Sequence, residues 1–155
     1  MYPIPKLKDW NFNVNITRLI LLLECERKLM VKLFTNRLSY LCSAHNVLRG
    51  YNFVALKGRS TSIPIHTINN VLEDARETNK ELWIAFQDMA KAFDSVGLLP
   101  LRRALQRIRI SQPAINFIID LFDQRNIRII TAHGLSKGFV AQDGIDQGEV
   151  ISPLL

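Results

Sequence analysis

Two short segments carry the residues whose types and spacing could do chemistry. In the first, LWIAFQDMAKAFDSV (residues 82–96), an apolar run ends at Asp88. A carboxylate at the end of a buried strand can hold a divalent cation beside a substrate. An aspartate in this place can equally cap a following helix. Spacing alone leaves both interpretations open.

The second segment is the loop DGIDQGEVISP (residues 143–153). Gly144 and Gly148 allow the backbone to pass close to a partner, and Gln147 brings two donors and an acceptor. The same loop can be a flexible connector to a helix that begins at Ser152-Pro153. Both interpretations stay open at this point.

Basic residues form the third feature that could bind a ligand. The 155 residues include 20 Lys and Arg against 14 Asp and Glu, which gives a net charge of +6. This surplus permits a polyanionic partner such as nucleic acid without requiring one. The candidates for phosphate contacts are Lys6, Lys8, Arg18, Lys57, Arg59 and the arginines at 102, 103, 107 and 109. The arginines can also form an ordinary solvated helix face.

The sequence gives little indication of a zinc site, a disulfide, a signal peptide or a membrane-spanning segment. The three histidines are isolated and no CxxC motif occurs, so a zinc site is not indicated. Cys25 and Cys42 fall in one helical stretch, roughly 25 Å apart, too far for a disulfide. We expect reduced thiols in an intracellular protein. The N-terminus does not resemble a signal peptide, and the apolar run 19–23 is too short for a membrane span.

The elements that must position these residues follow from hydrophobic periodicity. The sequence predicts an extended arm and a short strand over residues 1–16, then an amphipathic helix over 18–42. Its expected buried face is Leu22, Cys25, Leu29 and Leu33. A loop (43–60) leads to a helix capped by Ser60 or Thr61, with the buried stripe Ile65, Ile68, Leu72 and Ala75.

The second half of the chain begins with a predicted buried strand over 82–86. A helix follows with Leu98, Leu101, Leu105 and Ile108 inside, and another opens at Pro113 with Ile115, Ile118 and Phe122 inside. Residues 126–142 predict a hairpin that turns at 134–137.

In chain order, these motifs resemble those of reverse transcriptases from non-LTR (LINE-type) retrotransposons. IPKLKDW with TRLILLLECERK resembles the fingers of that family, and GRSTSIPIHTINNVLEDA resembles its Gly-Arg-Ser-Thr segment and helix. QDMAKAFDSV is similar to the first catalytic motif of the palm, and GIDQGEVISPLL to the next one. The resemblance covers nearly the whole chain. It implies an α+β fold, with fingers over 1–80, part of the palm over 81–155, and helices on a small, incomplete antiparallel sheet.

The resemblance also implies a role for each matching residue. Asp88 would hold both catalytic Mg²⁺ ions, assisted by the carbonyl of Met89, and Phe93 would exclude a ribose 2′-hydroxyl. Gln147 and Gly148 would line the nucleotide pocket, while Arg18 and Lys6 would grip the triphosphate. Lys57 and Arg59 would contact nucleic acid. The implied partners are an RNA template, a DNA primer and deoxynucleoside triphosphates, without a membrane.

Some positions depart from the pattern of the family. Leu19 and Lys57 stand where proline is frequent, and the paired Asp-Asp hairpin of the palm is absent from these 155 residues. One carboxylate cannot hold two Mg²⁺ ions, so we expect weak or absent metal binding and no polymerase activity in this polypeptide. It would then be a shortened polymerase, a non-catalytic nucleic-acid-binding remnant, or a decayed element. An incomplete palm edge would favour self-association.

Overall fold

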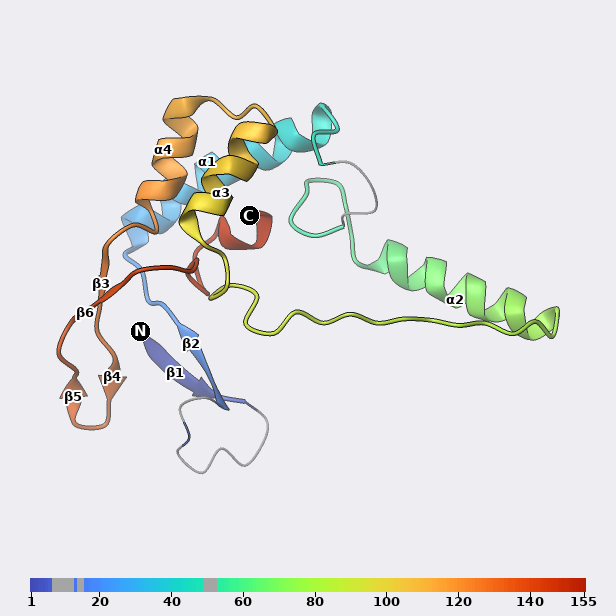
Figure 1. Ribbon diagram of the computed structural model, residues 1–155, viewed down its shortest axis with the longest axis horizontal. Coiled ribbons are helices and arrows are strands. Elements are labelled where there is room, and N and C mark those ends of the chain that lie inside the picture. The colour runs from blue at the N-terminus through green and yellow to red at the C-terminus, as the bar shows by residue number, and fades with distance from the viewer. Residues whose placement is uncertain (7–12, 14–15, 49–52) are drawn as a thin grey trace. The chain divides into compact units, whose positions relative to one another are not determined.

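The computed structural model describes residues 1–6, 13, 16–48 and 53–155 (Figure 1). The chain divides into two compact units, each described by itself. The first contains Met1–Val31, Lys91–Pro153 and Leu155, and the second contains Lys32–Ala90 and Leu154. None of the described helices is both long and apolar enough to cross a membrane.

The N-terminal strands of the first unit form an antiparallel pair. Strand β1 (Tyr2–Pro5) pairs with β2 (Thr17–Ile20), so that Ile4 lies opposite Arg18. The extended arm is therefore a strand. The prediction that a helix begins at Arg18 is wrong, because residues 17–20 make their backbone hydrogen bonds to β1. The strand predicted within residues 11–16 lies mostly outside the described residues.

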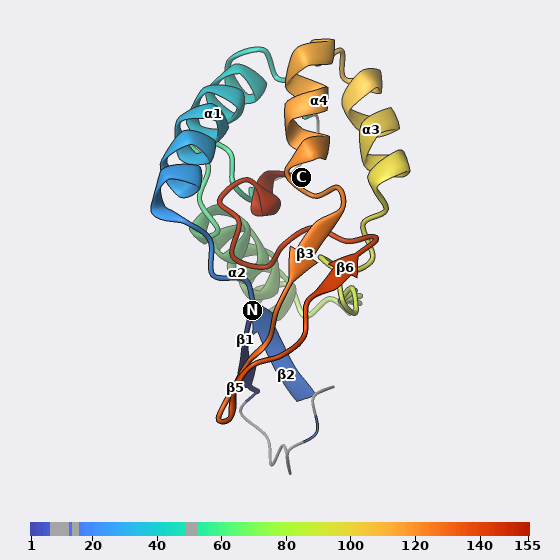
Figure 2. The same ribbon diagram turned by 90° about the vertical axis from the view of Figure 1, so that its left-hand side faces the viewer.

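Two short helices provide the apolar core of the first unit. Helix α3 (Leu98–Arg107) packs against α4 (Gln112–Asp120), as Figure 2 shows. The buried side chains are Leu101 and Leu105 on α3, Ile115 and Ile118 on α4, and Phe122 in the turn after α4. The apolar spacing predicted both helices and most of their buried residues, whereas Leu98 and Ile108 of the predicted face are only half-buried.

The predicted hairpin is also present. Strand β3 (Arg125–Ile127) pairs antiparallel with β6 (Phe139–Ala141), and β4 (Ile130–Thr131) pairs with β5 (Gly134–Leu135) nearer the tip. The turn lies at residues 132–133, two residues before the predicted position. A 3-10 helix, η2 (Ser152–Leu154), begins where Ser152-Pro153 predicted a helix start.

Helix α1 (Cys25–Ala44) forms, but it buries a different face from the predicted one. Leu29 and Leu33 are 62% and 65% exposed, whereas the buried positions are Val31, Thr35, Leu38, Ser39 and Cys42. Apolarity alone indicated the wrong face because two of the buried residues are polar. Both cysteines lie in this helix and are free thiols, and burial raises the pKa of Cys42.

Helix α2 (Ser62–Glu77) lies where the sequence predicted it. Thr61 is its N-cap but makes no side-chain capping bond, and the Ser60 hydroxyl accepts a hydrogen bond from the amide of Ser62 at 3.2 Å. The predicted buried stripe is wrong: no residue of α2 is buried, and Ile65 and Ile68 are 56% and 40% exposed.

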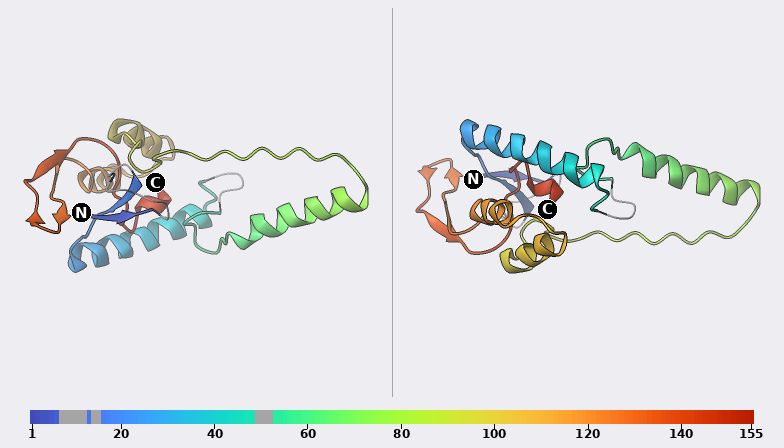
Figure 3. Two further views of the ribbon diagram at one scale, coloured as in Figure 1. Left: turned by 90° about the horizontal axis from the view of Figure 1, so that it is seen from below. Right: turned by 90° about the horizontal axis from the view of Figure 1, so that it is seen from above.

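The segment Leu82–Phe86 is the main departure from the predicted elements. It is extended and precedes α3 without forming a strand (Figure 3). Trp83 and Phe86 are 85% and 84% exposed. A strand needs a hydrogen-bonding neighbour, and within the described part of the chain no strand pairs with these residues. The described sheets are three antiparallel pairs, which with the helices give the predicted α+β fold.

Candidate nucleotide and nucleic-acid site

The Gln-Gly loop is tied to two other motif segments of the first unit. The amide of Ile145 donates to the Phe93 carbonyl at 2.9 Å, and the amide of Gly144 donates to the Val96 carbonyl at 3.1 Å. At the other end of the loop, the Gln147 carbonyl accepts from the amide of Leu21 at 3.0 Å. Three segments that are far apart in the sequence therefore meet along one backbone loop.

The two glycines of this loop are required by close backbone approach. Gly144 and Gly148 have φ of +87° and +120°, a region that favours glycine. A Cβ on Gly144 would lie 3.2 Å from the Asp94 carbonyl oxygen, and one on Gly148 would lie 2.9 Å from the Leu21 carbonyl oxygen. The backbone does pass close to a partner, and in this structure the partner is the chain itself.

Two ion pairs flank the Gln147-Gly148 turn. Asp146 pairs with Arg125, and Glu149 pairs with Arg27 at 2.9 Å between Oε2 and Nη2. The carboxylate side chains are 4% and 0% exposed. Because buried charge is costly without a partner, these two pairs fix the residues on both sides of the turn.

Arg125 is the centre of this network. Its guanidinium donates to the carbonyls of Phe122 at 2.8 Å, Asp143 at 3.2 Å and Gly144 at 2.8 Å, besides pairing with Asp146. Burial lowers the pKa of Arg125, and the positive charge of Arg27 lowers it further. Arg125 therefore holds the loop through the carbonyls of Asp143 and Gly144 and through the carboxylate of Asp146.

The sequence prediction missed all four members of these pairs. Arg125 lies on β3, outside the motifs that resemble the reverse transcriptase family, and Arg27 lies on α1 within the TRLILLLECERK segment, where the resemblance implied no role for it. The only sequence signal was a pair of acidic residues, Asp146 and Glu149, on either side of Gln-Gly in a basic chain. Their partners follow only from the fold.

The predicted triphosphate-binding residues lie on neighbouring strand segments. The Lys6 amide donates to the Ile16 carbonyl at 2.9 Å, directly beyond the β1–β2 pair that contains Arg18. Both side chains are exposed, while Phe93 and Gln147 are half-buried. The structure places Arg18 in the β1–β2 pair and Lys6 directly beyond it.

The second unit contains the other predicted site residues. Asp88, Met89, Lys57 and Arg59 are all exposed. Asp88 does not cap the following helix, since turns occupy residues 90–95 and Gly97 is the N-cap of α3. Asp88 and Gln147 lie in different units, so their predicted meeting across a nucleotide-sized gap stays a prediction.

A two-metal centre is not supported by the described residues. In those parts of the chain, no group of three or more His, Cys, Asp or Glu side chains could hold a metal ion. Two Mg²⁺ ions need several oxygen ligands, and Asp88 by itself supplies too few. These residues alone therefore do not fit the metal site that the family implies.

The assembled motif segments agree with comparison to known proteins. The chain belongs to the family described as reverse transcriptase (RNA-dependent DNA polymerase), which matches residues 4–155. It is 26% identical over 153 residues to a "Retrovirus-related Pol polyprotein from type-1 retrotransposable element R2" of Popillia japonica, covering 98% of the chain. It is also 26% identical over 138 residues, 89% of the chain, to a "Probable RNA-directed DNA polymerase from transposon BS" of Drosophila melanogaster.

The predicted relation to retrotransposon reverse transcriptases is thereby confirmed. The chain spans 21% of the length of the Popillia protein and 15% of that of the Drosophila protein. No solved structure matches the chain.

Proposed function

We propose that this chain forms the fingers and part of the palm of an RNA-directed DNA polymerase, with fingers over 1–80 and palm over 81–155. The observation that supports this most is the bonding of loop 143–149 to Phe93 and Leu21. The segments that would contact the sugar, the base and the triphosphate are joined in one compact unit before any nucleotide binds.

In this proposal, the protein side chains bind and orient the nucleotide. Arg18 and Lys6 neutralise triphosphate oxygens, and Phe93 excludes a 2′-hydroxyl. Gln147 and Gly148 line the pocket near the sugar and the template base. Positioning of this kind, with cationic clamps, is the main contribution of proteins to phosphoryl transfer.

Asp88 would hold Mg²⁺ in this proposal, assisted by the carbonyl of Met89. Because Asp88 alone offers too few oxygen ligands, we propose that the 155-residue polypeptide binds Mg²⁺ weakly and does not polymerise DNA.

A primer-extension assay tests the inactivity of the polypeptide. With Mg²⁺, deoxynucleotides and an RNA template annealed to a DNA primer, we expect no incorporation above a buffer blank, because the metal ligand set is incomplete. An active reverse transcriptase in the same buffer is the positive control. Incorporation by the wild-type polypeptide that Asp88→Asn abolishes would show the proposal to be wrong.

Binding of nucleic acid without chemistry is the second candidate function. The net charge of +6 and the exposed Lys57 and Arg59 support it. The exposed apolar side chains of Leu82, Trp83, Ile84, Phe86 and Met89 support self-association in either case, since exposed apolar surface favours association.

Salt dependence tests the binding of nucleic acid. In a fluorescence titration with an RNA–DNA hybrid, the affinity should fall about tenfold or more between roughly 50 and 200 mM salt, because phosphate neutralisation releases counterions. The double variant Lys57→Ala/Arg59→Ala should reduce the logarithmic salt slope by about 2. Thr67→Ala, an exposed neutral change on α2, is the control. Affinity that does not vary with salt would exclude this function.

A further inference from the structure

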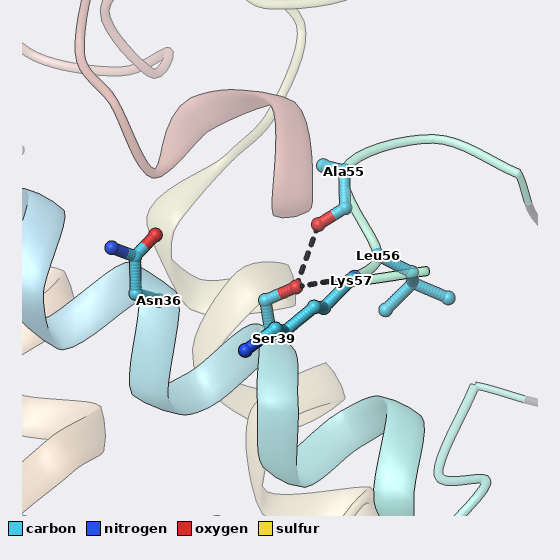
Figure 4. A pocket seen from close by; sticks show the side chains of 5 residues that line it. All are labelled: Asn36, Ser39, Ala55, Leu56 and Lys57. Atoms are coloured by element: carbon cyan, nitrogen blue, oxygen red, sulfur yellow. Dashed lines mark hydrogen bonds between the residues drawn. The ribbon is translucent and has the colours of Figure 1, made fainter. Parts of the chain in front are cut away.

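The second unit contains a cavity with a wall fixed by hydrogen bonds. It has a volume of about 380 Å³ and is lined by Asn36, Ser39, Ala55, Leu56 and Lys57. Figure 4 shows the hydroxyl of Ser39 between two backbone groups of the loop. It donates to the Ala55 carbonyl at 2.8 Å and accepts from the Lys57 amide at 3.0 Å.

Further contacts hold this loop against α1. The Ser43 hydroxyl donates to the Lys57 carbonyl at 3.0 Å, one helical turn after Ser39. Ala55 has a φ of +56°, a conformation that residues with a Cβ seldom adopt, and its carbonyl is held by the Ser39 hydroxyl. Leu56 is 8% exposed and anchors the loop in the core of this unit. The cavity is therefore built by defined contacts.

Two ligand-binding side chains, Asn36 and Lys57, line the cavity, and an aromatic ring, that of Tyr40, lies beside Lys57. The exposed Asn36 amide offers donors and an acceptor, and Lys57 offers an ammonium group. Tyr40 lies one helical turn after Asn36, on the same face of α1. Its ring is 55% exposed, and the Lys57 Nζ lies 5.4 Å from the ring centroid. A cation, an aromatic ring and an amide are therefore close together.

We propose that this cavity binds one unpaired nucleotide. Lys57 contacts the phosphate, Tyr40 stacks on the base, and Asn36 bonds to an edge of the base. A volume near 380 Å³ is within the range of small-ligand pockets. Bases within a duplex are stacked and paired, so an aromatic face and an amide select an unpaired, splayed base.

This inference deepens the proposed nucleic-acid binding, on which it rests, because it names the form of nucleic acid that the second unit takes. The phosphate and base could belong to a single strand or to a free nucleotide. The two sources share the same chemistry at Lys57 and Tyr40, and competition separates them. If adenosine monophosphate displaces the strand at a similar concentration, the occupant is the free nucleotide; if it does not, the occupant is the strand.

The test compares a short, labelled, single-stranded adenine RNA with a blunt RNA–DNA hybrid. Tyr40→Ala should weaken binding of the single strand by about tenfold, as expected for the loss of one base–aromatic stack. Asn36→Ala should weaken it by about threefold to tenfold through the lost bonds to the base. Affinity for the hybrid should change by less than about twofold, because its bases are not splayed.

Matched controls separate binding from folding. Tyr40→Phe keeps the ring and should retain single-strand affinity. Asn70→Ala removes an exposed asparagine from α2, outside the cavity, and should change nothing. Circular dichroism checks that each variant keeps its helices.

The outcomes separate the nucleotide site from hybrid recognition. Single-strand affinity that is unchanged in Tyr40→Ala, or an equal loss for the hybrid, overturns the nucleotide site. Hybrid binding without single-strand binding overturns the nucleotide site alone. Tyr40-dependent single-strand binding without hybrid binding supports the site and contradicts hybrid recognition. Binding of neither probe overturns both claims.

Discussion

Arg125→Ala is expected to lower the free energy of unfolding by about 3–5 kcal/mol, the range for breaking a buried ion pair. The substitution leaves the Asp146 carboxylate buried without its partner, because its side chain is only 4% exposed. It also removes the donor to the carbonyls of Phe122 and Gly144. Urea denaturation followed by circular dichroism measures the change.

The neighbouring Arg128→Ala is the matched control. Arg128 is exposed, three residues after Arg125, and its loss should cost less than about 0.5 kcal/mol. Replacing both partners of the pair, as Arg125→Met with Asp146→Leu, should recover much of the lost stability, because no charge is then left unpaired. A cost below about 1 kcal/mol for Arg125→Ala would mean that the pair does not hold the loop.

Gly148→Ala is expected to cost about 2–3 kcal/mol through two effects. A Cβ is strained at a φ of +120°, and it would lie 2.9 Å from the carbonyl oxygen of Leu21. The loop must shift to relieve this contact, which weakens the bond between the Leu21 amide and the Gln147 carbonyl. Denaturation gives the cost, and hydrogen exchange at the Leu21 amide should become faster.

Gly134→Ala separates the cost of backbone strain from the cost of the close contact that a Cβ on Gly148 would make with Leu21. Gly134 has a similar φ of +111°, but nothing lies within 4 Å of the position of its Cβ. We expect a cost of about 1–2 kcal/mol from strain alone, and no change in exchange at the Leu21 amide. Equal costs and equal exchange in the two variants would contradict the packing of Gly148 against Leu21.

The sequence predicted best those elements whose apolar spacing matches their burial. Leu101 and Leu105 on α3, and Ile115 and Ile118 on α4, are buried as expected because each helix turns one apolar face to the same core. The hairpin was predictable from its apolar runs and central glycine. The turn near Phe93 and the Gln-Gly loop were identified from residue types, and the structure brings them into contact.

The remaining features depend on partners that local patterns do not reveal. The buried face of α1 includes Ser39, whose polar group is satisfied by a loop some sixteen residues away. Trp83 and Phe86 are typical of a buried strand, but strand formation requires a neighbour and none is described. The ion pairs of Arg27 and Arg125 span 122 and 21 residues, beyond any periodicity.

The bond between the Leu21 amide and the Gln147 carbonyl has a consequence for ligand entry. Arg18 lies in β2, three residues before Leu21. The backbone from Arg18 to Leu21 and the hydrogen bond from Leu21 therefore connect Arg18 to Gln147. Under their proposed roles, the spacing between the triphosphate contact and the sugar contact is fixed before a nucleotide arrives. The proposed site would therefore be preorganised, and less conformational entropy would be lost on binding a nucleotide.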